Sequence, residues 1–287
     1  MTELELFRIA IVLIGTGIAA YFDVFNKKNV PDLFLYGFLG IALFVNIFDF
    51  SVFLSILPIA GMMIILLYLM YRIGQIGGAD VIVIASIFCA LPSIQDSLLS
   101  QPPIFPDVLP IQLPSIFSIL AISAFLFAIS TVLKFGPKIA KRISKGKKLS
   151  ISPTSIIQTI ILVVIYGFFL FIAKDFIGVF ISINYLLFVT VVILIILFFS
   201  LFKDTITEMM VSWRKIVYTE DVIALESIDR KTVEKYKLGR LITEDQLKRM
   251  KKLKRKWPVL DLPMFLPYIF VALIIYILFG DPLFYPI

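Results

Sequence analysis

Two aspartates of this 287-residue chain, Asp23 and Asp80, lie where apolar runs meet charged loops. Asp23 precedes the segment Lys27-Lys28-Asn29-Val30-Pro31, and Asp80 ends the segment Gly77-Gly78-Ala79-Asp80. Few acids lie in or against the apolar runs, and this pair falls on one face of the membrane under the topology that the basic residues indicate. Two carboxylates held close together can share a proton and activate a water molecule. The pair therefore predicts a hydrolytic centre of the aspartic type.

The residue types exclude several other chemistries. The chain has no histidine, and Cys89 is its one cysteine. Zinc sites, disulfides and catalysis by histidine or cysteine are therefore excluded, which leaves carboxylates, hydroxyls and lysines. We expect no metal and no cofactor.

The composition places these aspartates in a membrane protein. Hydrophobic residues make up 60% of the chain, which is not typical of a soluble globule. A bilayer core needs about 20 apolar residues per helix. Apolar runs recur at 4–22, 33–48, 50–71, 81–95, 111–133, 149–173, 176–202 and 262–280. We therefore predict an all-α polytopic membrane protein with about eight transmembrane helices.

The basic residues indicate the orientation of these helices. If the N-terminus is outside and the helices alternate, 25 of the 27 Lys and Arg residues lie inside, and Arg8 and Lys174 lie outside. Long loops are weak evidence, but without the 15 basic residues of 203–261 the ratio is still 10 to 2. Asp23 and Asp80 then lie at the cytoplasmic face of a plasma membrane. The net charge of +7 reflects topology and attraction to membrane lipid, so we expect no nucleic-acid partner.

The first apolar run could instead be a signal peptide. The residues before it are acidic, Glu3 and Glu5, and the basic pair Lys27-Lys28 follows it. A signal peptide has the opposite arrangement. We expect this run to remain as the first membrane helix.

Composition divides the chain into four parts. They are a membrane core with the two aspartates on its first and fourth helices (1–135), a basic linker with two more membrane helices (136–202), a cytoplasmic α+β insert (203–261) and a last membrane helix (262–287). Gly136-Pro137 is expected to end the fifth helix. Within the insert, 222–243 alternates apolar and polar residues and suggests a β element, and an amphipathic helix is expected from 244 to about 254.

Each aspartate also has a purely structural interpretation. Asp23 could merely mark the membrane interface, and Asp80 could cap the N-terminus of its helix. Their common membrane face and the short connections between their helices favour a functional site. Gly77 and Gly78 would let another helix or an extended peptide approach closely.

These motifs resemble the type IV prepilin peptidase family, whose members are membrane aspartic proteases with a Gly-x-Gly-Asp signature. Gly77-Gly78-Ala79-Asp80 resembles that signature, and Val30-Pro31 matches the Ile-Pro or Val-Pro step that follows the family's first catalytic Asp. Leu262-Pro263-Met264-Phe265-Leu266-Pro267 resembles a Pro-Phe-x-Pro-Phe-like step. The cysteine-rich zinc segment of bacterial members is missing, so the chain is similar to the archaeal preflagellin and prepilin peptidases. Ala79 departs from the signature's second Gly, and the loop before Pro31 is about one residue longer than usual.

The resemblance implies that Asp23 and Asp80 are the catalytic dyad. The implied substrate is a pilin-like or archaellin precursor, cut between its short basic leader and its apolar helix at the cytoplasmic face. Asp32 could then contact the leader. The residues that would shape the site are Gly77, Gly78 and Pro31.

Three other classes stay open. A proton-coupled secondary transporter would use membrane acids as a relay, and it predicts acids near mid-helix and paired half-repeats. A presenilin-type intramembrane protease would share the signature but would cut within the bilayer. A structural subunit of a membrane assembly would use 203–261 for docking.

Overall fold

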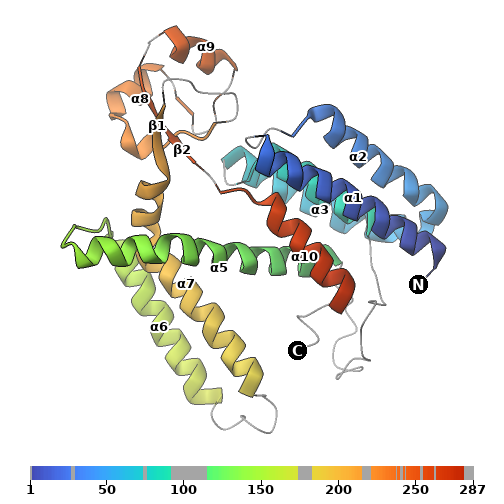
Figure 1. The fold of residues 1–287 in the computed structure, drawn as a ribbon, viewed down its shortest axis with the longest axis horizontal. Helices are drawn as coiled ribbons and strands as arrows, with labels where there is room; N and C mark the ends of the chain where they lie inside the picture. Colours follow the sequence, from blue (N-terminus) through green and yellow to red (C-terminus); the bar gives the residue numbers. More distant parts are fainter. Residues whose placement is uncertain are drawn as a thin grey trace. The chain divides into compact units, whose positions relative to one another are not determined.

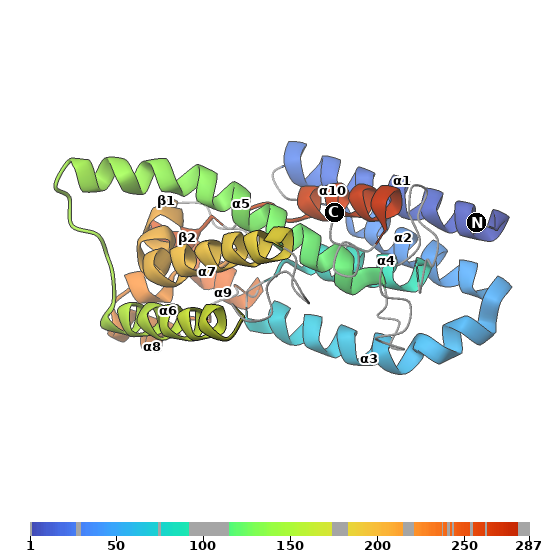
Figure 2. The same cartoon turned by 90° about the horizontal axis from the view of Figure 1, so that it is seen from below.

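The computed structural model describes residues 2–26, 30–73, 76–91, 115–173, 183–214, 221–236, 238–239, 242, 244–252, 255–261 and 263–280. The predicted loop residues Lys27, Lys28 and Asn29 lie outside this part of the chain. The described residues form a mostly helical fold with a small two-stranded sheet (Figures 1 and 2). The chain divides into two compact units. The first holds Met1–Ala124 and Arg214–Tyr285, and the second holds Phe125–Trp213.

The first unit contains a bundle of apolar helices. They are α1 (Glu3–Phe25), α2 (Asp32–Phe44), α3 (Phe50–Ile73), α4 (Gly78–Ala90) and α10 (Leu266–Phe279), and the 3-10 helix η1 (Val45–Asp49) joins α2 to α3. α1 packs against α2, α4 and α10, and α4 also packs against α2 and α3. The helices that carry Asp23 and Asp80 are therefore in direct contact.

Glycines let α1 approach its neighbours closely. A Cβ built on Gly15 would lie 2.3 Å from the Phe38 ring of α2, and a Cβ on Gly17 would lie 3.2 Å from the Phe270 ring of α10. Residues two apart on a helix point to different sides, so Gly15 faces α2 and Gly17 faces α10. Small residues at such contacts are typical of helices that associate in a bilayer.

The second unit contains most of α5 (Ser115–Ser144), together with α6 (Pro153–Ala173) and α7 (Ile183–Met210). Polar side chains connect α6 and α7 along otherwise apolar surfaces. Tyr166 and Thr190 share a hydrogen bond of 2.6 Å, and Thr159 donates to Ser200 at 3.0 Å. A hydroxyl in hydrocarbon has no water to bond, so such pairs help to hold the two helices together.

The expected break at Gly136-Pro137 is wrong, because α5 continues through Pro137 to Ser144. The residues around Pro137 bury apolar side chains, and Phe135 and Ile139 pack with Ile206 of α7. This packing offsets the hydrogen bond that proline cannot make.

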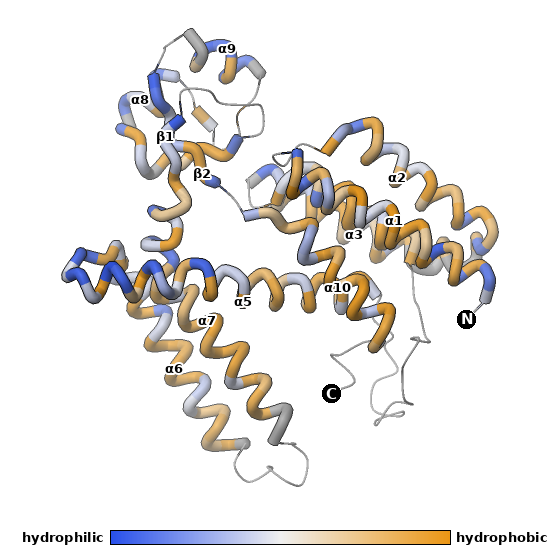
Figure 3. Tube along the Cα trace, viewed as in Figure 1, coloured by the Kyte–Doolittle hydropathy of each residue, from blue (hydrophilic) through white to orange (hydrophobic). Residues whose placement is uncertain are grey.

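Among the residues that the structure describes, five helical segments are long and apolar enough to cross a membrane. They are Glu3–Phe25, Asp32–Asp49, Ser115–Ser144, Pro153–Ile172 and Leu186–Met210, and shorter apolar helices lie at Leu57–Arg72, Gly78–Ala90 and Leu266–Phe279. Hydrophobic residues line most of α6, α7 and α10 (Figure 3). Many of these side chains are exposed, for example Val164 and Phe168. Such surfaces suit a lipid environment, and the helices indicate a multi-pass membrane protein.

A small mixed structure precedes α10. It consists of β1 (Val211–Arg214), η2 (Leu225–Ser227), α8 (Arg230–Tyr236), α9 (Glu244–Lys252) and β2 (Trp257–Leu260), with β1 paired to β2. The amphipathic helix predicted from residue 244 is confirmed as α9. The β element predicted within 222–243 is wrong in extent. That stretch contributes the bridge Ile223–Val259 and then forms α8.

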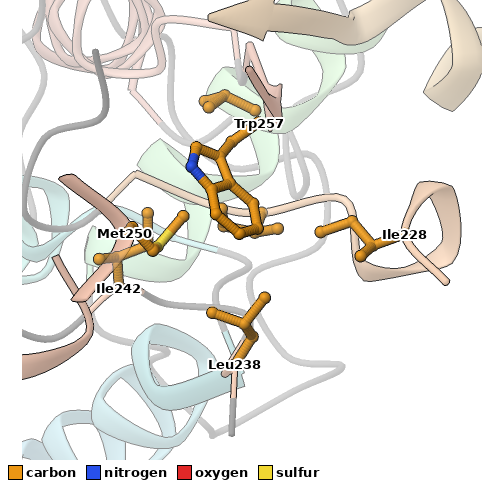
Figure 4. Packing of buried hydrophobic residues seen from close by; sticks show 7 residues of the cluster. Ile228, Leu238, Ile242, Met250 and Trp257 are labelled. Atoms are coloured by element: carbon orange, nitrogen blue, oxygen red, sulfur yellow. The ribbon is translucent and has the colours of Figure 1, made fainter. Parts of the chain in front are cut away.

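Trp257 fills the core of this small structure (Figure 4). Its indole is 1% exposed and packs in a cluster with Ile223, Ile228, Leu238, Ile242, Met250 and Val259. The cluster draws on η2, α8, α9 and β2 and their connections. Residues 222–243 therefore do not form a hairpin, because their apolar side chains pack against the Trp257 indole.

Candidate functional site

Two contacts establish how the helix ends are arranged. The Phe22 ring, near the end of α1, lies 6.1 Å from the ring of Phe34, near the start of α2. At the other end of the bundle, Asn46 follows α2 and its Nδ2 donates to the carbonyl of Cys89, near the end of α4, at 3.0 Å. α1 therefore runs antiparallel to α2, and α4 runs parallel to α2. The end of α1 and the start of α4 consequently lie at the same end of the bundle.

The two aspartates also lie at similar levels along the bundle. The hydrogen-bonded pair Asn46 and Cys89 marks one common level along the bundle axis. At a rise of about 1.5 Å per helical residue, Phe34 lies about 18 Å along the axis from this level, and Asp80 lies about 14 Å from it. Asp23 follows the residue that contacts Phe34. Asp23 is then about 20 Å from the level of Asn46, so the two levels differ by about 6 Å, which is about one helical turn.

Asp23 is 6% exposed and lies two residues before the end of α1, so it does not itself end the helix. Asp80 is the third residue of α4 and is partly buried. Its Oδ2 accepts a hydrogen bond from the backbone N–H of Gly77 at 3.1 Å. Asp80 is therefore not the N-cap, which is Gly77, but its carboxylate satisfies the N–H of Gly77 from the first turn of α4. The hydrogen bond to Gly77 is compatible with a catalytic role for Asp80, because a carboxylate has two oxygens and about four acceptor positions.

The two glycines lie at the start of α4. Gly77 is the residue immediately before the helix, and Gly78 is its first residue. A Cβ on Gly77 would lie 3.1 Å from Oδ2 of Asp80, which is tighter than most side-chain contacts. A glycine at this position therefore leaves space for the carboxylate.

The Val30-Pro31 step leads directly into α2. Pro31 precedes the first helical residue with a φ of −61°, and Val30 is buried. Asp32 is exposed in the first turn of α2, at the same end of the bundle as the two aspartates. A carboxylate there also stabilises the helix N-terminus, so Asp32 has a structural role beside any contact with a substrate.

The last helix begins with the expected proline-containing step. α10 starts at Leu266, and Pro267 lies in its first turn, where a proline costs no hydrogen bond. α10 packs along α1, which carries Asp23.

Sequence reasoning did not assign roles to several polar residues of the bundle. Arg8 is buried, and its Nη2 lies 4.0 Å from Oδ2 of Asp49. Asn46 is 2% exposed and donates to both Ala42 and Cys89. These contacts lie at the end opposite Asp23. The sequence did show that each polar residue lies near the end of an apolar run, which could have marked it as a candidate for a buried contact. It did not show which residue would be its partner.

Asp204 has a structural role in the second unit. Its Oδ2 accepts from the backbone N–H of Ser152 at 3.0 Å and from the hydroxyl of Ser155 at 3.2 Å. These donors lie at the N-terminus of α6, where an anion is favourable. Asp204 therefore joins the end of α7 to the start of α6.

The chain matches no family model, no curated protein and no solved structure. The class that its helices define is a mostly helical, multi-pass membrane protein. Its candidate site is the end of the bundle where α1 ends and α2 and α4 begin.

Proposed function

We propose that the chain is a membrane aspartic endopeptidase of the prepilin and preflagellin peptidase type. The observation that carries the proposal is the placement of two carboxylates at one end of one bundle: Asp23 in the last turn of α1 and Asp80 in the first turn of α4. The contact between α1 and α4 supports it. The Gly-Gly-Ala-Asp and Val-Pro motifs lie at this same end.

In the proposed mechanism one carboxylate is ionised and the other protonated. Asp80 lies at a helix N-terminus and accepts the Gly77 N–H, and both features favour the anion. Asp23 is buried near a helix C-terminus, where the neutral acid is favoured. Asp80 would therefore take the proton of the attacking water, and Asp23 would donate a proton to the scissile carbonyl or the leaving amine.

The substrate is a precursor with a short basic leader and an apolar helix. Counting the three shorter apolar helices with the five long ones gives the eight spans that the sequence predicts. With eight spans, the distribution of Lys and Arg favours an outside N-terminus and a site on the cytoplasmic side. A basic leader stays on that side as well. Cleavage at the membrane surface exposes the peptide bond to the water that hydrolysis consumes. Asp32, exposed at this end, supplies a negative charge that a leader lysine could meet.

The test is mass spectrometry of a candidate pilin-like precursor incubated with the purified protein. The wild type should release the leader, while Asp23→Asn and Asp80→Asn should each reduce the rate by at least about a thousandfold. Asp49→Asn is the matched control, because its carboxylate lies at the opposite end of the bundle. Size-exclusion profiles show whether each variant is folded. Wild-type cleavage rates in both aspartate variants would refute the dyad.

The position of the cut separates this proposal from an intramembrane protease. A prepilin-type enzyme cuts at the junction of leader and helix, whereas a presenilin-type enzyme cuts within the apolar segment. The peptide masses report the junction directly.

A further inference from the structure

Five basic side chains line one hollow in the second unit. They belong to Lys138, Lys141, Arg142, Lys145 and Lys147, and the open hollow between them has a volume of about 180 Å³. We refer to these five residues as the basic hollow. The proposed peptidase reaction does not use it, and a basic leader would be repelled by it.

The end of α5 places these side chains together. Residues 141, 142 and 145 follow residue 138 by three, four and seven positions, so all four share one side of the helix. Gly146 then adopts a φ of 63°, and the N–H groups of Gly146 and Lys147 donate to the carbonyls of Ile143 and Arg142 at 2.9 and 3.1 Å. This pair of bonds is a Schellman motif, which reverses the chain. It returns Lys147 to the lysines of the preceding turns.

The side of the same segment next to the basic side chains is apolar and packed. Phe135 and Ile139 are buried against Ile206 of α7 in one cluster. The packing fixes which side of α5 faces outward, so the basic side is held in place by the unit itself. Figure 3 shows the hydrophilic end of α5 following its hydrophobic part.

The hollow keeps a net positive charge. Arg142 pairs with Glu208, its Nη1 lying 3.3 Å from Oε1, so one acid offsets one of the five cations. Cations at a helix C-terminus are favourable on their own account. The helix C-terminus alone does not account for four lysines in one hollow, because their like charges repel one another.

We propose that the basic hollow binds the phosphate headgroup of an anionic membrane phospholipid. The hollow begins five residues after Leu133, the last residue of an apolar stretch, which places it at the depth of lipid phosphates. Leu133 and Ile143 are 70% and 55% exposed on other sides of α5, so the helix that carries the hollow also presents apolar side chains to acyl chains. A free phosphate ion would use the cations but would gain nothing from these residues. The inference is independent of the proposed peptidase activity.

The test counts lipids bound to the full-length protein by native mass spectrometry in detergent. Phosphatidylglycerol should be retained in preference to phosphatidylcholine, and the double variant Lys138→Gln/Lys141→Gln should bind it about 25-fold more weakly, at about fivefold per charge. The matched control is Lys248→Gln/Arg249→Gln, which removes two exposed charges from α9 and should leave binding unchanged. Equal losses in both double variants would overturn the proposal in favour of bulk charge.

Two further arms keep the proposal falsifiable. Gly146→Ala removes no charge but opposes the positive φ that returns Lys147, so it should weaken phosphatidylglycerol binding severalfold. Inorganic phosphate at millimolar concentration should not displace the lipid. Full binding by Gly146→Ala, or displacement of the lipid by phosphate alone, would contradict a lipid headgroup site.

Discussion

The backbone N–H of Gly77 lies 3.1 Å from Oδ2 of Asp80, and a Cβ added to Gly77 would lie 3.1 Å from the same oxygen. The amide thus orients the carboxylate while the missing side chain leaves room for it. In an aspartic centre both carboxylates must be held in a defined geometry, so this contact gives the Gly-Gly step before α4 a physical function.

Gly77→Ala should reduce precursor cleavage about tenfold without unfolding the protein, because the carboxylate must shift by a few tenths of an ångström. The measurement is the initial cleavage rate. Gly37→Ala is the control, since nothing lies within 4 Å of an added Cβ there. Equal rates in the two variants would show that the Gly77 contact does not position the catalytic carboxylate.

Gly15→Ala should destabilise the bundle by about 1–3 kcal/mol, because the added Cβ would lie 2.3 Å from the Phe38 ring. The unfolding midpoint in detergent reports the change. Phe38→Leu should partly restore the stability of Gly15→Ala by removing the ring. Strictly additive effects of the two substitutions would contradict a direct contact.

Asn46→Leu should lower the free energy of unfolding by about 1 kcal/mol, because the buried amide is the donor to the carbonyls of Ala42 and Cys89. Without it, the end of α4 loses a partner from the segment after α2. Thermal unfolding in detergent measures the effect. A midpoint equal to that of the wild type would indicate that this bond does not hold α4 in place.

The two tryptophans should differ in their access to a quencher. Trp213 is 53% exposed in β1, and Trp257 is 1% exposed in the core of the small structure before α10. Acrylamide should therefore quench Trp257→Phe, which retains Trp213, far more than Trp213→Phe. Similar quenching of both variants would mean that the cluster around Trp257 is not formed.

The sequence was sufficient to place the candidate residues at helix ends, because hydropathy alone marks where apolar runs begin and stop. Asp23 lies two residues inside α1 and Asp80 three residues into α4, so the boundaries moved by a few positions. The pairing of Asn46 with Cys89 could not be predicted. It joins residues 43 apart, and its formation depends on how α2 packs against α4.

Local rules failed where tertiary packing outweighed them. Pro137 was expected to end α5, but buried contacts of Phe135 and Ile139 carry the helix onward. The alternation within 222–243 indicated strands, but Ile228, Leu238 and Ile242 gather around Trp257. The partners that decide the two outcomes, Ile206 and Trp257, are distant in sequence from the segments they pack against. The periodicity of a segment does not report such contacts.

The central claim is that the side chains of residues 23 and 80 come close enough to share one water molecule. The most direct measurement is cross-linking of an Asp23→Cys/Asp80→Cys pair with a short bifunctional thiol reagent in a Cys89→Ser background. Digestion and mass spectrometry should recover one linked peptide pair in high yield, and Asp49→Cys/Asp80→Cys should give none. Absence of the link in folded protein, with both thiols still reactive toward a single-headed reagent, would contradict the account.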